Sequence, residues 1–181
     1  MNRVRRMVVA AVAAASVVLA TSTAARAAFV FNHTDGFDSS PAATWLFVGT
    51  GGFEYNQGTA LTAPNNAWVT APGANTWSSV GKPLTLPATG GAWIDCDAVI
   101  YVRAAWGARV NFEIINRADW RYIALLPVTL SPSTSYQRLA LNNWSGQARN
   151  IFVRVAIIGD GSMRVIRVDQ LSVHCDYEVI E

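Results

Sequence analysis

The sequence contains few of the side chains on which most enzymes rely. It has only two histidines among 181 residues, His33 and His174. It contains no G-x-S-x-G elbow, no H-E-x-x-H and no Cys/His zinc spacing. A phosphate-binding loop and a dinucleotide fingerprint are missing as well. These absences argue against serine hydrolases, zinc enzymes and nucleotide-dependent enzymes.

Long hydrophobic runs are scarce too, and the one that stands out lies at the N-terminus. Three arginines precede an apolar stretch over residues 7–20, and the small-x-small pattern Ala25-Arg26-Ala27 follows it. The stretch is shorter than the ~20 residues that a membrane span needs. We therefore predict a cleaved signal peptide over residues 1–27 and a secreted domain over residues 28–181 without a membrane span.

Positive charge is not in excess once this segment is removed. Residues 28–181 contain ten basic and twelve acidic residues, a net charge of −2. Nucleic-acid recognition normally needs a clustered basic face. We therefore do not expect a nucleic-acid partner.

Carboxylate pairs are also rare. A glycosidase needs two carboxyl groups on either side of the scissile bond. Glu113, on the predicted solvent-facing side of a strand, is the best single candidate, and only Asp95 and Asp97 are expected on a comparable face. A small polysaccharide-active enzyme that uses Glu113 therefore remains an alternative.

The cysteines number only two, Cys96 and Cys175. In an oxidising compartment an even count predicts a disulfide. The alternative is a pair of reduced, buried thiols.

Sustained helical periodicity is absent from residues 28–181, where short runs of β-forming residues alternate with turn residues. Such repeated short strands predict an all-β antiparallel sandwich or a barrel. Alternation places Cys96 and Cys175 on inward faces, and it needs a β-bulge near Asp169-Gln170. The predicted strands cover residues 29–32, 45–48, 67–70, 83–86, 96–104, 110–115, 121–126, 136–141, 151–157 and 165–173.

Three segments resemble the galactose-binding-like jelly roll of carbohydrate-binding modules in secreted bacterial proteins. They are Gly36-Phe37-Asp38 followed by Trp45, the strand Tyr101-Val102-Arg103-Ala104, and the closing Val168-Asp169-Gln170-Leu171-Ser172-Val173. The resemblance covers most of residues 28–181. It implies a jelly-roll sandwich and a polysaccharide or cell-wall glycan as partner.

The resemblance also implies a structural calcium ion. In these modules the opening acid and the aspartate of the last strand often share Ca²⁺, and the matching positions here are Asp38 and Asp169. Calcium needs several oxygen ligands in loop-like segments. The family usually has Glu where this chain has Asp38. The alternative is that Asp38 caps a turn and Asp169 is a surface or bulge residue.

Aromatic side chains at turns are the strongest indication of a binding site, because sugar rings stack on aromatic faces while their hydroxyls bond to polar groups. Trp106, Trp120 and Trp144 lie at predicted turns, whereas Trp45, Trp68 and Trp93 are expected in the core. We expect a ligand to contact Trp120, Trp144 and a polar groove on one sheet formed by Tyr101, Arg103, Asn111, Glu113 and Arg154. The predicted function is non-catalytic carbohydrate binding. A secreted structural, inhibitor or adhesion protein is the alternative.

Overall fold

Every regular element in the described part of the chain is a β-strand. The computed structural model describes residues 29–38, 44–62, 64–87, 94–145 and 148–177. The predicted signal peptide and Trp93 lie outside the described residues. The strands are β1 (Phe29–Asp35), β2 (Leu46–Val48), β3 (Thr50–Tyr55), β4 (Asn65–Ala71), β5 (Trp77–Thr85), β6 (Ile94–Arg103), β7 (Ala108–Asn116), β8 (Tyr122–Leu130), β9 (Gln137–Ser145), β10 (Asn150–Ile158) and β11 (Arg164–Tyr177).

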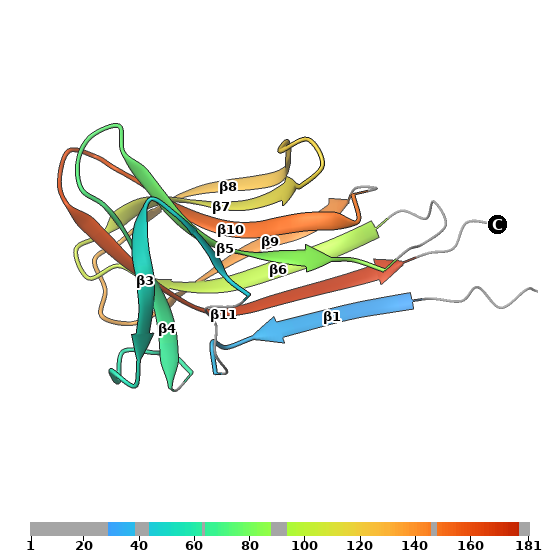
Figure 1. The fold of residues 1–181 in the computed structure, drawn as a ribbon, viewed down its shortest axis with the longest axis horizontal. Coiled ribbons are helices and arrows are strands. Elements are labelled where there is room, and N and C mark those ends of the chain that lie inside the picture. The colour runs from blue at the N-terminus through green and yellow to red at the C-terminus, as the bar shows by residue number, and fades with distance from the viewer. Residues whose placement is uncertain (1–28, 39–43, 63, 88–93, 146–147, 178–181) are drawn as a thin grey trace, which may run out of the picture.

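The strands form two antiparallel sheets. Sheet A has the order β3-β4-β11-β6-β9, with β1 also paired to β11, and sheet B has the order β2-β5-β10-β7-β8. The long strand β11 pairs with β4 through its first half and with β1 through its second half. Figure 1 shows β3 and β4 turning away from the direction that β1, β6 and β11 share.

The core lies between the two sheets and follows the expected alternation. Ile100 and Val102 of β6 face Phe112 and Ile114 of β7 across one hydrophobic cluster, and all four are fully buried. Their neighbours in sequence point outwards, as period-two patterning requires. The predicted all-β antiparallel sandwich is confirmed.

The predicted disulfide is also confirmed. Cys96 and Cys175 are bonded, and they are direct partners in the register of β6 and β11. Both are buried in the core. The predicted bulge is present as well: the register of β11 against β6 shifts between Asp169 and Ser172, and Gln170 has a φ of 46°.

The bounds of β3 and β5 differ from the prediction, because both strands contain glycine, serine or threonine, which are typical of turns. Residues 50–52 lie outside the predicted strands but belong to β3, and β5 begins at Trp77 rather than at residue 83. A Cβ on Gly81 would lie 2.7 Å from Phe152 of the neighbouring strand. Close packing, not a turn, therefore requires this glycine.

In the part of the chain that the structure describes, no helix is long and apolar enough to cross a membrane.

Loss of the disulfide should destabilise the sandwich strongly. The bond joins residues separated by 79 positions, and the chain-entropy model gives about 4 kcal/mol for a loop of that size. Urea unfolding of the Cys96→Ser/Cys175→Ser double variant should show a loss of this order. Wild-type protein under reducing conditions is the control and should match the variant. An unchanged unfolding midpoint in both would contradict the prediction.

Candidate functional site

A groove lies on the outer face of sheet B. It has a volume of about 350 Å³, and it is lined by Trp77, Asn111, Glu113, Tyr122, Arg154, Ala156 and Ile158. These residues come from β5, β7, β8 and β10. We call this feature the sheet B groove.

The floor of the sheet B groove holds a buried ion pair. Glu113 and Arg154 are direct partners in the register of β7 and β10, so both side chains emerge on the same face. The Arg154 Nε and Nη2 atoms lie 2.6 and 2.5 Å from Glu113 Oε2. Asn111 Nδ2 donates to Glu113 Oε1 over 3.3 Å. Glu113 is only 2% exposed although it belongs to the outer face. These partners replace the water that the carboxylate loses.

Two exposed aromatic rings flank this ion pair. Trp77 is 46% exposed and Tyr122 is 55% exposed. The Arg154 guanidinium lies 5.3 Å from the centroid of the Trp77 ring, a cation–π contact that holds the two groups together. Apolar ring faces beside fixed hydrogen-bonding groups suit a sugar, whose rings stack while its hydroxyls bond.

Apolar side chains border the sheet B groove. Leu46 and Val48 of β2 pair with residues of β5, and Leu125 of β8 pairs with Glu113. All three apolar side chains are exposed. The groove is therefore polar at its floor and apolar along its rim.

Trp120 extends the aromatic surface beyond the groove. It lies in the turn between β7 and β8 with a φ of 59°, and its backbone N–H donates to Asn116 O over 2.8 Å. Its ring makes an edge contact with Phe152, with centroids 6.2 Å apart. Trp120 is 61% exposed, which confirms the predicted accessibility of this residue.

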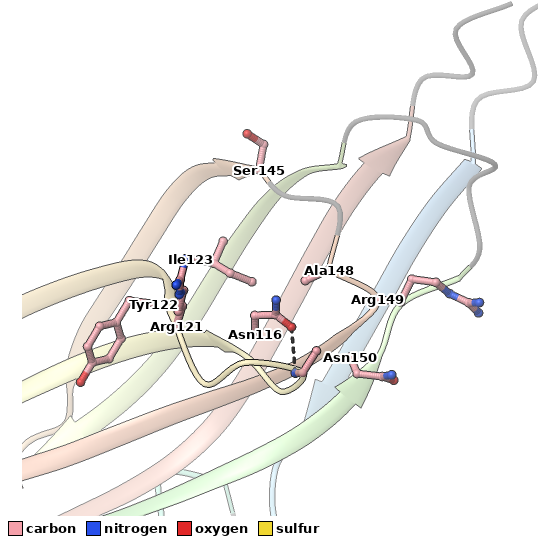
Figure 2. Close-up of a pocket in the computed structure, with 9 residues that line it drawn as sticks. Asn116, Arg121, Tyr122, Ile123, Ser145, Ala148, Arg149 and Asn150 are labelled. Atoms are coloured by element: carbon pink, nitrogen blue, oxygen red, sulfur yellow. Dashed lines mark hydrogen bonds between the residues drawn. The ribbon is translucent and has the colours of Figure 1, made fainter.

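A second, larger hollow adjoins the groove at this end of the sandwich. It measures about 650 Å³, and Tyr122 lines both hollows. Figure 2 shows Arg121 and Tyr122 on one side of it, Arg149 and Asn150 on the other, and Asn116 and Ala148 between them. The sheet B groove and this hollow are therefore neighbours that share Tyr122.

The prediction of a single groove from five polar residues is wrong in part. Asn111, Glu113 and Arg154 do lie together on sheet B, but Tyr101 and Arg103 belong to β6 of sheet A. The chain crosses from one sheet to the other between β6 and β7, so these outward-facing side chains lie on opposite faces of the molecule.

The prediction for Trp144 is wrong. This residue is 6% exposed and packs in the core. Asn143 has a φ of 54°, and the register of β9 against β6 shifts at this point. Trp144 therefore pairs with the inward-facing Cys96 instead of pointing to solvent.

The remaining tryptophans divide differently from expectation. Trp45 is buried and Trp106 is 75% exposed, as predicted. Trp68 is partly exposed on β4, opposite Arg167, so its predicted core position is wrong. Trp77 and Tyr122, which open β5 and β8, are not among the predicted site residues. The Ser-Ser-x-Gly stretch after Trp77 has the composition of a turn, so the start of β5 was not predicted. Tyr122 lies at the start of the predicted strand 121–126, and an exposed aromatic at a strand end could have indicated a binding residue.

The outer face of sheet A carries a closed polar network. Arg167 donates to both carboxylate oxygens of Glu54, over 2.7 and 2.8 Å. Asn66 donates to Glu54 as well, over 2.9 Å. Partial burial works to raise the pKa of Glu54, but the hydrogen bonds from Arg167 and its neighbours outweigh it and lower the pKa to about 2. Because these groups satisfy one another, the network is structural.

Asp38 and Asp169 lie near the same threonine. A Cβ on Gly36 would lie 2.9 Å from both Asp38 Oδ2 and Thr62 Oγ1, and the Thr62 hydroxyl donates to Asp169 Oδ1 over 3.1 Å. The backbone N–H groups of residues 61, 62 and 170 also donate to the Asp169 carboxylate. Burial raises the pKa of Asp169, while these donors oppose the rise.

This arrangement does not fit a calcium ion. Calcium needs free oxygen lone pairs, whereas four donors already face the oxygens of Asp169. Among the described residues, no group of three or more His, Cys, Asp or Glu side chains could hold a metal. The contacts instead make Asp169 an anchor for the loop between β3 and β4.

Comparison with known proteins identifies the fold. No family model and no curated relative matches the sequence. The CBM22-1 xylan-binding domain of Xyn10C from Paenibacillus barcinonensis is 11% identical, with a TM-score of 0.57 over 82% of this chain and 94% of that one. TmCBM61 in complex with β-1,4-galactotriose is 10% identical, with a TM-score of 0.50 over 78% and 86%.

An adhesin domain shares the same fold. The K2 cleaved adhesin domain of Lys-gingipain is 12% identical, with a TM-score of 0.54 over 79% of this chain and 99% of that one. At these identities the likeness shows the fold alone. The chain folds as the jelly roll of carbohydrate-binding modules, which confirms the resemblance expected from the sequence.

The low pKa of Glu54 predicts an acid-sensitive contribution to stability. Its folded pKa of about 2 lies below the usual 4.5, so the contribution is complete above pH 4.5 and is lost as pH falls towards 2. Glu54→Gln should cost about 1–2 kcal/mol of unfolding free energy at pH 7, and the difference from wild type should shrink below pH 4.5. Asp119→Asn, in an exposed turn, is the control. A difference that stays constant down to pH 2 would refute the assignment.

Chelation should leave the stability unchanged. Because hydrogen-bond donors occupy Asp169, we expect the same Tm in EDTA and in excess Ca²⁺. A structural ion would instead raise Tm by several degrees through mass action. Differential scanning calorimetry in both buffers measures the effect, and a calcium-dependent rise would restore the calcium site implied by the resemblance.

Proposed function

We propose that this protein is a secreted, non-catalytic carbohydrate-binding protein whose ligand occupies the sheet B groove. The single observation that carries the proposal is the pair of exposed rings, Trp77 and Tyr122, on either side of the buried Glu113–Arg154 pair. The rings offer stacking faces, and Asn111 and the outer edge of Arg154 offer hydrogen-bond donors beside them.

The geometry of the groove suits a chain ligand better than a small enclosed one. Trp77 pairs with Ile158 at one end of β10, and Phe152, beneath Trp120, lies near the other end. Residues 152 and 158 are six positions apart along β10, which corresponds to roughly 20 Å at the usual rise per residue. A surface of this length accommodates several sugar residues. Proteins with this fold include a xylan-binding domain and a domain bound to β-1,4-galactotriose, so we propose a polysaccharide as the ligand class.

The non-catalytic assignment follows from the surroundings of Glu113. Both of its oxygens have partners, and no second carboxylate lines the sheet B groove among the residues that the structure describes. A glycosidase needs two carboxyl groups across one bond. The alternative of a polysaccharide-active enzyme that uses Glu113 therefore gains no support from this geometry.

Secretion is supported by two features. The N-terminal residues have the pattern of a signal peptide, and a formed disulfide is typical of an oxidising compartment. An extracellular or cell-surface location also matches a glycan partner.

Truncation of the groove aromatics should abolish most glycan binding. We expect Trp77→Ala and Tyr122→Ala each to weaken binding by about tenfold, because a stacked ring loses its contact area. Binding is measured by a glycan array and by pull-down on insoluble polysaccharides, followed by titration of the best ligand. Trp106→Ala is the matched control, since this exposed tryptophan does not line the groove.

Two results would overturn the proposal. Wild-type protein with a normal melting transition that binds no glycan would favour the protein-binding or adhesion alternative. Equal binding by Trp77→Ala, Tyr122→Ala and wild type would place the ligand elsewhere.

A further inference from the structure

Arginines gather at the end of the sandwich beyond Tyr122. Arg117 and Arg121 lie in the turn between β7 and β8, and Arg149 precedes β10. The two segments are tied together, because the Arg117 N–H donates to Asn150 O over 2.9 Å. The Asn116 N–H donates in turn to Arg121 O, also over 2.9 Å. We call Arg117, Arg121 and Arg149 the basic end.

Among the described residues, little negative charge compensates the basic end. The one ion pair found there joins Arg121 to Asp119 at 3.9 Å, with the Arg121 side chain mostly in solvent. Neither Arg117 nor Arg149 makes an ion pair with any residue that the structure describes. Residues 28–181 carry a net charge of −2, so the local positive charge of the basic end is opposite in sign to the net charge of the domain.

Exposed aromatic rings accompany these arginines. Trp120 lies between Arg117 and Arg121 in the chain, and it lines a hollow of about 330 Å³ together with Arg117 and Asn150. Its left-handed backbone and its contact with Phe152 fix the ring before any ligand arrives. Tyr122 connects this end to the sheet B groove.

The arginines are spread along the surface and do not converge on one point. Figure 2 shows Arg121 and Arg149 on opposite sides of the larger hollow, with the Arg149 guanidinium directed outwards. A single small anion would need convergent donors. A polymer with regularly spaced negative groups can reach each guanidinium separately.

We propose that the basic end binds the carboxylate groups of an acidic polysaccharide whose chain continues into the sheet B groove. This inference rests on the proposed function, since it assigns a ligand class to the sheet B groove and to the basic end beside it. The planar guanidinium donates two parallel N–H groups, a geometry that matches a carboxylate. The negative charge of Glu113 is balanced by Arg154, so this carboxylate adds no net repulsion to a polyanion. A sulfated polysaccharide offers a related anionic group, so the test includes it as a separate arm.

The test compares one backbone in charged and neutral forms. A polyuronide, the same polymer fully methyl-esterified, a sulfated polysaccharide and a neutral xylan are titrated against wild type by isothermal calorimetry. The test variant is Arg117→Gln/Arg149→Gln. The control variant, Arg103→Gln/Arg138→Gln, removes the same charge from the outer face of sheet A, opposite the sheet B groove.

We expect the polyuronide to bind at least about fivefold more tightly than its methyl ester at low salt, and the test variant to lose this preference. The control variant should change affinity less than about twofold. Raising the ionic strength from about 0.01 M to about 1 M shortens the screening length from roughly 30 Å to roughly 3 Å, so the preference should also disappear in high salt.

Each contrary result has a distinct meaning. Equal binding of acid and ester in wild type, with Trp77 still required, overturns the acidic ligand and leaves the proposed function intact. Tighter binding of the sulfated polymer than of the polyuronide overturns the carboxylate assignment. An equal loss of polyuronide affinity in the test and control variants would show that only the overall charge matters, and it would overturn the assignment of the basic end. Failure of a folded sample to bind any of the four polymers, or any glycan of the array, overturns the proposed function as well.

Discussion

The pairing of Glu113 with Arg154 is the constraint around which the outer face of sheet B is organised. A carboxylate that is only 2% exposed must recover from its partners the stabilisation that water would have given it. The register of β7 and β10 supplies the guanidinium directly opposite, and Asn111 supplies a further donor. Arg154 also faces Trp77, so the same contact that satisfies Glu113 fixes a ring at the edge of the groove. Because these side chains are already fixed, they would lose little conformational entropy when a ligand binds in the groove.

The two outer faces show why charge alone does not identify a site. Sheet A also carries a carboxylate–guanidinium pair, Glu54 with Arg167, and it is more completely hydrogen-bonded than the pair on sheet B. On sheet A, however, the loop between β3 and β4 covers the neighbouring Asp169. On sheet B the ion pair lies beneath exposed aromatic rings in an open groove. Accessible stacking surface, and not the ion pair, therefore distinguishes the proposed binding face on sheet B from the polar network on sheet A.

The sequence predicts the local pattern well and the long-range arrangement poorly. Period-two alternation correctly places Cys96 and Cys175 inwards, and the change of parity in the last strand correctly locates the bulge near Gln170. Alternation cannot say which sheet a strand joins, so Tyr101 and Glu113 share a predicted groove although β6 and β7 lie in different sheets. It also fails at Trp144, where one left-handed residue, Asn143, reverses the direction of the next side chain.

Gly81, whose role is not evident from the sequence, explains how the aromatic side chains on the outer face of sheet B are placed. Gly81 looks like a turn residue, yet it lies within β5, where Phe152 occupies the space that a Cβ would need. With Phe152 settled over this glycine, its ring can support the edge of Trp120. Trp120 lies between Arg117 and Arg121 in the chain, so the packing of Phe152 on Gly81 reaches the basic end through the contact between Phe152 and Trp120. A side chain at position 81 would displace Phe152 and, through it, the Trp120 ring at the basic end. The absence of a side chain at position 81 is therefore a determinant of the proposed binding surface and not a local irregularity.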